Sequence, residues 1–352
     1  MKMTKRRKAL RIVLSVLIIV LSLFFLQRLL VPKYVDDIIE GAFIKEFYGE
    51  ENKDFNLIFL GDCEVYENFA PQILWDEYGI SSYIRGSADQ YIWQSYYLLE
   101  DTLLYTKPEA VVFNVLSMKF NESQSEAYNR MSLEGMEWSG VKVKAILASM
   151  KEDEHFLDYV FPILRYHSRW SELNSGDIQY MFDTKRVSNN GYYMRVDTRP
   201  AKDVPQGRPL NNYDFGDNAW KYLDMMRELC EKEDIELILI KAPSLYPYWY
   251  EEYEKQIDDY AEKYGLSYYN FLELGEETKI DYNTDTYDGG LHMNLKGAEK
   301  LTRYFGNILS QDIGLKNLRG DSELEKVWDE NREEFESDKE AQYKLYGIKE
   351  GT

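Results

Sequence analysis

Cysteine and histidine are scarce in this chain, which has two of the first and three of the second among 352 residues. Two cysteines cannot build the disulfide framework of a small secreted domain. They also form no Cys-x-x-Cys pair, which argues against a thiol–disulfide oxidoreductase. The histidines, His155, His167 and His292, are dispersed along the sequence, and we therefore expect no metal ion and no cofactor.

Basic residues are in the minority as well. The chain has 42 Lys and Arg against 62 Asp and Glu, which gives a net charge of −20. Because nucleic-acid binding is driven by basic side chains that neutralise phosphates, we expect no nucleic-acid partner. Hydrophobic residues make up 44% of the sequence, enough to bury a large core, and the length allows one large domain or two smaller ones.

The N-terminus combines a basic segment with a long apolar run. Residues 1–11 are rich in Lys and Arg, Ile12–Leu26 has no charge, and the apolar run resumes after two polar residues up to Val31. About twenty helical residues span about 30 Å, the thickness of a hydrocarbon core. A cleaved signal peptide is one alternative, but no small-x-small cleavage site follows the apolar run. A buried helix of a soluble domain is the other alternative. We predict a cytoplasmic tail at 1–11, a single-pass cell-membrane signal anchor at 12–31 and an extracellular remainder.

Residues 55–320 alternate between apolar runs of strand length and segments with helical periodicity. This alternation predicts an α/β domain, a flavodoxin-like three-layer α/β/α sandwich whose parallel sheet carries its site at the carboxyl ends of the strands. The expected strands are 55–60, 80–84, 110–116, 235–240 and 266–271, and the expected helices are about 90–105, 216–233, 248–264 and 294–309.

Three segments depart from this rhythm. Residues 32–54 read as a stalk or entry helix. An insertion at about 117–215, with a helix at 151–173, is expected to form a lid or accessory face. Residues 321–352 are strongly charged and are expected to form a surface helix or tail.

The first motif of chemical interest is Gly61-Asp62-Cys63, between the first expected strand and a helix start. A thiol at a helix N-terminus has a lowered pKa and is a candidate nucleophile as the thiolate. The alternatives are an inert buried thiol, or a disulfide with Cys230 that would disable the nucleophile. Cys230 itself lies on an expected amphipathic helix, where a packed core thiol is the simplest interpretation.

The second motif is Asp288-Gly289-Gly290-Leu291-His292, which precedes the last helix of the domain. A nucleophile on one loop and an Asp/His pair on another is the layout of covalent acyl-transfer catalysis. We expect Asp288 to orient His292, with Asp285 as the second choice. Lys241 and Ser244, which follow the fourth expected strand, lie on the same predicted edge and are candidate substrate contacts together with Arg85.

These two blocks resemble those of SGNH/GDSL-type hydrolases, whose first block is Gly-Asp-Ser; here Cys63 stands at the nucleophile position. The family pattern places the aspartate three residues before the histidine, whereas Asp288 lies four before His292. The resemblance implies an oxyanion hole made of the Cys63 N–H, the Gly86 N–H and the Asn114 side chain. Asn114 as an ordinary amide at a strand end is the alternative.

The anchor and the closing block together resemble a membrane-anchored branch related to the DltD protein of teichoic-acid D-alanylation and to proteins of polysaccharide O-acylation. That resemblance implies an esterase or acyltransferase acting on acyl esters of a cell-envelope polymer, teichoic acid or polysaccharide. It also implies a multi-pass membrane acyltransferase as partner. The competing hypothesis is a catalytically silent SGNH-like protein that binds the polymer or scaffolds the membrane partner.

Overall fold

The structure is a computed structural model that describes residues 5–34, 38–39, 41–180 and 186–349. Within it the chain forms two compact units. One unit comprises residues 1–40 and 150–186, and the other comprises residues 41–149 and 187–352. The larger unit contains both motifs.

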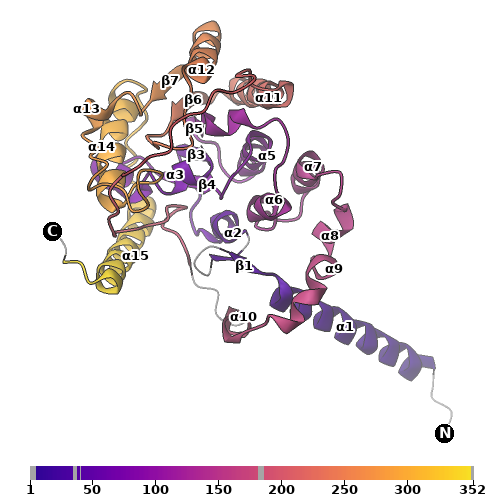
Figure 1. The fold of residues 1–352 in the computed structure, drawn as a ribbon. Coiled ribbons are helices and arrows are strands. Elements are labelled where there is room, and N and C mark those ends of the chain that lie inside the picture. The colour runs from indigo at the N-terminus through magenta and orange to yellow at the C-terminus, as the bar shows by residue number, and fades with distance from the viewer. Residues whose placement is uncertain (1–4, 35–37, 40, 181–185, 350–352) are drawn as a thin grey trace. The chain divides into compact units, whose positions relative to one another are not determined.

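A five-stranded parallel sheet forms the centre of the larger unit (Figure 1). Its strands are β3 (Leu57–Gly61), β4 (Ser82–Gly86), β5 (Ala110–Asn114), β6 (Glu236–Lys241) and β7 (Ser267–Asn270). Their order, β4-β3-β5-β6-β7, is that of a doubly wound flavodoxin-like sheet, and every neighbouring pair is parallel. The predicted α/β fold class is therefore confirmed, and each of the five expected strands is present.

Helices cover both faces of this sheet (Figure 1). α4 and α14 pack together with α15 on one face, while α5 packs with α7 and α11 on the other. The helices of the larger unit are α2 (Ala42–Gly49), α3 (Cys63–Tyr66), α4 (Pro71–Tyr78), α5 (Ile92–Thr102), α6 (Glu126–Leu133), α7 (Gly140–Ser149), α11 (Asp217–Glu233), α12 (Glu251–Tyr264), α13 (Gly275–Thr278), α14 (Leu295–Gln311), α15 (Ser322–Tyr346) and the short 3-10 helix η1 (Val115–Lys119).

The core beside the Gly61-Asp62-Cys63 motif is aromatic. Phe59 of β3 stacks on Phe69, which follows α3, with ring centroids 5.1 Å apart. Phe305 of α14 contacts both of these rings and Phe271, which follows β7. All four side chains are fully buried. Each such ring removes a large apolar area from water, so this cluster fixes the sheet, the turn after β3 and α14 relative to one another.

The segment expected as a stalk belongs largely to the globular units. Two short antiparallel strands, β1 (Lys33–Tyr34) and β2 (Ile38–Ile39), precede α2. Phe43 and Phe47 of α2 are buried, and Phe47 packs edge-on against Tyr83 of β4. The i, i+4 spacing of these apolar residues therefore places them on the buried face of α2, a helix that packs onto the larger unit.

The expected insertion is divided between the two units. Residues 117–149 and 187–215 lie in the larger unit, and 150–186 lie in the smaller one with the N-terminal helix. The single helix expected at 151–173 is wrong, because the chain forms α8 (Phe156–Val160), α9 (Ile163–Tyr166), the 3-10 helix η2 (His167–Ser171) and α10 (Ser175–Tyr180) instead. Pro162 causes the first break, since it lacks an N–H and forces Phe161 out of the helical region.

The charged C-terminal segment forms a docked helix. α15 begins at an Asp321 cap, whose side chain accepts hydrogen bonds from the N–H groups of Glu323 and Leu324. Trp328 of α15 is buried and stacks on Trp75 of α4, with ring centroids 5.3 Å apart and planes inclined by 10°. Its indole N–H also donates to the Ser81 hydroxyl at 3.3 Å.

We predict that Trp328→Ala lowers the free energy of unfolding by about 3–5 kcal/mol, because it leaves a large cavity against Trp75. Leu345→Ala is the matched control on the same helix. Leu345 is 72% exposed, so its substitution should change stability by less than about 0.5 kcal/mol. Urea denaturation followed by circular dichroism measures both. Equal stability of the two variants would show that α15 is not docked.

Candidate active site

The Gly61-Asp62-Cys63 turn places Cys63 at the carboxyl edge of the sheet. β3 ends at Gly61 and α3 begins at Cys63. A Cβ atom on Gly61 would lie 2.5 Å from Cγ2 of Val65, so only glycine allows α3 to fold this close to the strand. The Asp62 side chain accepts a hydrogen bond from the Glu64 N–H at 3.1 Å and closes the turn.

His292 is held by Asp288. Asp288 Oδ2 lies 2.7 Å from Nδ1 of His292, and Oδ1 accepts hydrogen bonds from the backbone N–H groups of Leu291 and His292. Asp285, the second choice, instead pairs with Lys300 at 2.6 Å. The four-residue spacing from Asp288 to His292 is therefore compatible with an orienting carboxylate, because the tight turn brings the two side chains together.

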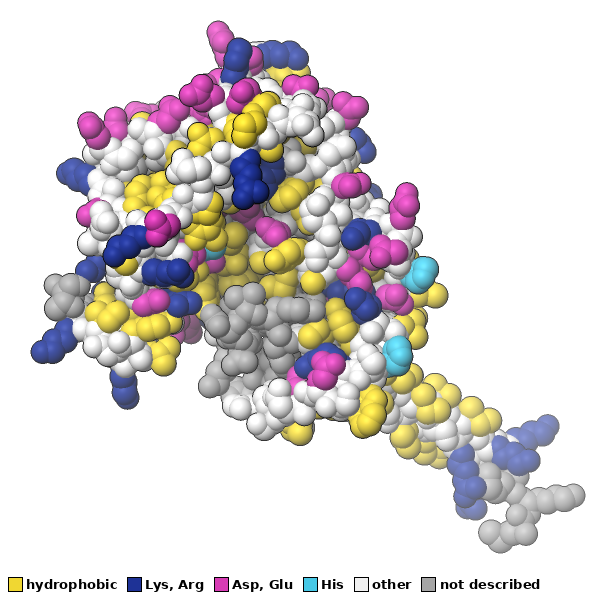
Figure 2. All heavy atoms as spheres, viewed as in Figure 1, with side chains coloured by type: hydrophobic (Ala, Val, Ile, Leu, Met, Phe, Trp, Pro, Cys, Tyr) yellow, Lys and Arg dark blue, Asp and Glu magenta, His cyan; other side chains and the backbone are white. Residues whose placement is uncertain are grey.

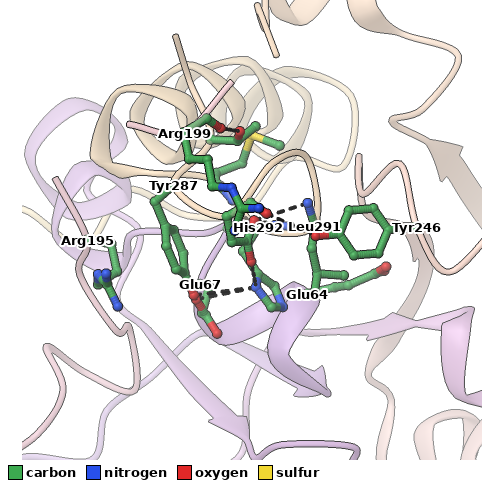
Figure 3. Close-up of polar contacts among 12 residues, drawn as sticks. Glu64, Glu67, Arg195, Arg199, Tyr246, Tyr287, Leu291 and His292 are labelled. Atoms are coloured by element: carbon green, nitrogen blue, oxygen red, sulfur yellow. Dashed lines mark hydrogen bonds and ion pairs between the residues drawn. The ribbon is translucent and has the colours of Figure 1, made fainter. Parts of the chain in front are cut away.

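A second carboxylate, Glu67, lies against the same imidazole (Figure 3). Its Oε2 is 3.7 Å from Nδ1 of His292, and it accepts a hydrogen bond from the Tyr287 hydroxyl. The Tyr287 ring stacks on the imidazole, with planes inclined by 18°. Glu67 is not among the residues that the sequence pointed to. The available signal was its position four residues after Cys63, one helical turn further along the chain.

The thiol of Cys63 is not activated in the way that the sequence suggested. Burial, opposed by His292 and helped by the nearby carboxylates of Asp62 and Glu67, raises the pKa of Cys63 to about 12. The prediction of a lowered pKa is therefore wrong. α3 has only four residues and provides little macrodipole, while the surrounding charges disfavour a thiolate.

The imidazole of His292 shows the complementary behaviour. Burial acts to lower its pKa, but the negative charge of Glu67, the interaction with Cys63 and the hydrogen bond with Asp288 raise the pKa of His292 well above its usual value. Nδ1 faces the carboxylates, while the buried Nε2 has no normal hydrogen-bond partner among the described residues. Nε2 is thus the nitrogen available for proton exchange with the thiol.

Of the expected oxyanion donors, the Asn114 side chain is already engaged in hydrogen bonds. Gly86 lies beside Gly61 at the end of β4, where a Cβ atom would be 3.1 Å from the Gly61 carbonyl oxygen. Asn114, at the end of β5, donates from Nδ2 to Glu64 at 3.0 Å and to Asp62 at 3.3 Å. Its Oδ1 accepts from the Ala242 N–H at 3.1 Å. The Asn114 amide therefore ties strand ends together, and it reaches a substrate only if these bonds break.

Lys241 and Arg85 do not line the site as expected. Lys241 is fully buried, and its ammonium donates to both carboxylate oxygens of Glu64 and to the Ala242 carbonyl. Arg85 is also fully buried and pairs with Asp101 at 3.1 Å. Both cations therefore form ion pairs in the interior of the domain. Ser244, which follows β6, is buried, and its hydroxyl has no hydrogen-bond partner among the described residues.

The remaining sequence questions concern disulfides and metals. Cys63 and Cys230 are both free thiols, so no disulfide disables the nucleophile position. Cys230 is buried on α11, as a packed core thiol would be. Within the described ranges, no group of three or more His, Cys, Asp or Glu is arranged to hold a metal ion.

Comparison with known proteins gives only distant structural similarity. No protein-family model matches the chain, and no curated protein matches it. The fold is similar to that of a GDSL-like lipase from Bacteroides thetaiotaomicron VPI-5482, with 12% identity, a TM-score of 0.36, and coverage of 78% of this chain and 100% of that one. A "putative acylhydrolase" from Bacteroides fragilis NCTC 9343 has 12% identity and a TM-score of 0.35, with coverage of 80% and 92%. Similarities this low carry no argument about activity, so the site is interpreted from its own geometry.

We predict that Asp288→Asn lowers the pKa of His292 by about one to three pH units, because it removes the carboxylate whose hydrogen bond to Nδ1 stabilises the imidazolium. Asp285→Asn is the control, since Asp285 pairs with Lys300 and should leave the imidazole unchanged. Imidazole NMR titration is practical because the chain has three histidines. The idea fails if the two variants shift the His292 titration equally.

Proposed function

We propose that this protein is an SGNH-type esterase or acyltransferase that uses Cys63 as nucleophile and His292 as the proton carrier. The observation that supports it is the arrangement of Cys63, His292 and Asp288 at the carboxyl edge of the sheet. Asp288 fixes Nδ1 at 2.7 Å, and the other ring nitrogen is left for the thiol. A nucleophile, a base and an orienting carboxylate are the parts that acyl transfer requires.

The reaction proceeds in two steps. The Cys63 sulfur attacks the acyl carbonyl carbon while its proton moves to Nε2 of His292. The intermediate then collapses, and the leaving alcohol takes that proton as a thioester forms. In the second step a hydroxyl group of water or of an acceptor attacks the thioester, gives its proton to His292, and the thiol is regenerated with that proton. The N–H groups of Cys63 and Gly86 are the proposed donors to the oxyanion.

The protonation states of Cys63 and His292 at rest determine how the rate depends on pH. Burial holds the thiol neutral, and the carboxylates favour the imidazolium over neutral imidazole. An imidazolium cannot accept the proton of the thiol, so one proton must leave the pair before attack. Activity is therefore expected to increase with pH through the raised pKa of His292.

For location and substrate, we propose a membrane-anchored envelope enzyme related to the DltD branch. α1 (Lys5–Leu30) is long and apolar enough to cross a membrane, with a mean hydropathy of 2.8 over its most apolar window. The basic residues before it favour a cytoplasmic N-terminus and an extracellular catalytic domain. The proposed substrate is an acyl ester of teichoic acid or an envelope polysaccharide, and the proposed partner is a multi-pass membrane acyltransferase.

Cys63→Ala and His292→Ala should each reduce the rate on acetyl and alanyl ester substrates by about 10²–10⁴-fold, because each removes a group that acts in the transition state. Cys63→Ser should retain part of the activity. Cys230→Ala is the matched control and should react like the natural chain. Steady-state rates with each ester provide the measurement. Equal activity of all four variants would support the catalytically silent alternative.

Glu67→Gln should move the pH–rate profile to lower pH. Glu67 is the main charge that raises the pKa of His292, so its loss makes neutral imidazole available at lower pH. We expect the rising limb of kcat/KM to move down by about one pH unit or more. Glu77→Gln, which removes a surface partner of Arg303, is the control. An unchanged limb in Glu67→Gln would separate this carboxylate from the chemistry.

A further inference from the structure

The smaller unit exposes large hydrophobic side chains in the segment from α8 to α10. Leu157, Phe161, Leu164, Trp170 and Ile178 are each between 50% and 72% exposed. Single exposed apolar residues are ordinary, but a group of five within one short segment is a feature of surfaces that contact a partner or a membrane. Figure 2 shows hydrophobic side chains on the surface near the C-terminal end of α1.

This segment is attached to the C-terminal end of α1. α9, η2 and α10 all contact that helix. Arg169 of η2 donates a hydrogen bond to the Leu30 carbonyl oxygen at 2.8 Å and a second one to the buried carboxylate of Asp177 at 3.1 Å. Leu30 itself is buried. The exposed hydrophobic residues are therefore held at one defined end of the apolar helix.

The exposed apolar surface of α1 ends close to where the surface of a membrane crossed by this helix would lie. The exposed apolar side chains of α1 extend from Leu10 to Leu26, a length of about 25 Å at the helical rise. Beyond Leu26 the side chains become partly or fully covered by protein. A hydrocarbon core is about 30 Å thick, so a membrane crossed by α1 would end close to the attached segment.

The part of the segment that contacts α1 carries basic side chains. Residues 163–171 contain Arg165, His167 and Arg169 and no acid. The acids of the segment, Asp158, Glu172 and Asp177, lie outside this part, and the last two pair with Arg169. Tyr166 and Trp170 occur in the same stretch. Basic residues together with Trp and Tyr are typical of segments at the membrane–water interface, where anionic headgroups attract the cations and the rings lie at headgroup depth.

We propose that residues 156–178 form an interfacial segment that lies in the lipid headgroup region around the end of α1. The occupant of its apolar surface is lipid, because that surface adjoins the exposed apolar surface of α1. This inference rests on the proposed membrane anchor. It gives the anchor a second, peripheral contact that restricts how the helix tilts and turns in the bilayer.

The test uses the full chain in vesicles of phosphatidylcholine and phosphatidylglycerol. Single cysteines are introduced in a Cys63→Ser, Cys230→Ser background and labelled with an environment-sensitive fluorophore. The test positions are Leu164→Cys and Trp170→Cys. Leu345→Cys is the water-exposed control on α15, and Leu17→Cys reports on α1. Quenching by nitroxide lipids and by aqueous iodide is compared at each position.

We expect nitroxide lipids to quench the labels at positions 164 and 170 at least about threefold more strongly than the label at 345. Quenching equal to that at 345, with the label at 17 in lipid, overturns the interfacial segment and leaves the anchor intact. Iodide access at 17 as well overturns both. Labels that are exposed in pure lipid vesicles but protected in native membranes assign the surface to a protein partner, which also contradicts the proposal.

Discussion

The buried ion pair between Lys241 and Glu64 is the constraint on which the carboxyl edge of the sheet depends. Glu64 lies next to Cys63, and Lys241 ends β6. The pair, 2.9 Å apart, therefore joins the turn after β3 to the end of β6, two strands away in the sheet. Asn114 of β5 completes the connection by donating to Glu64 and accepting from the Ala242 N–H. Neither charge is exposed, and removal of one partner from such a pair typically costs about 3–5 kcal/mol. The network orders three strand ends, and thereby the position of Cys63.

The charges around Cys63 and His292 have the opposite effect on the thiol pKa to the one expected from the sequence. Helix N-termini lower thiol pKa values when the helix is long and the site is open to positive potential. Here the helix is a single turn, and the carboxylates of Asp62 and Glu67 destabilise a thiolate at Cys63. Glu67 and Asp288 stabilise the imidazolium of His292. The carboxylates around Cys63 and His292 therefore favour a protonated thiol and a protonated imidazole.

How far the sequence predicts this protein depends on the range of the interactions concerned. Periodicity located the five strands and the main helices, because each depends on residues a few positions apart. The pairing of Asp288 with His292 could be predicted for the same reason, because only a tight turn separates the two residues. The interior roles of Arg85 and Lys241 could not be predicted, because their partners, Asp101 and Glu64, are set by sheet order and packing. The break at Pro162 was a local signal, and it outweighed the helical periodicity of 151–173.

A cysteine in this setting has a chemical logic of its own. The nucleophilicity of a thiolate increases with the pKa of its thiol, so a thiol with a raised pKa gives a stronger nucleophile once its proton has left. Proton transfer to a neighbouring base becomes easier as the two pKa values approach each other. Burial raises the pKa of Cys63 here, whereas Glu67, Cys63 and Asp288 raise the pKa of His292 against the effect of its burial. Under the proposed function, these pKa values favour attack in which the proton leaves the sulfur as the bond to the acyl carbon forms, over attack by a preformed thiolate.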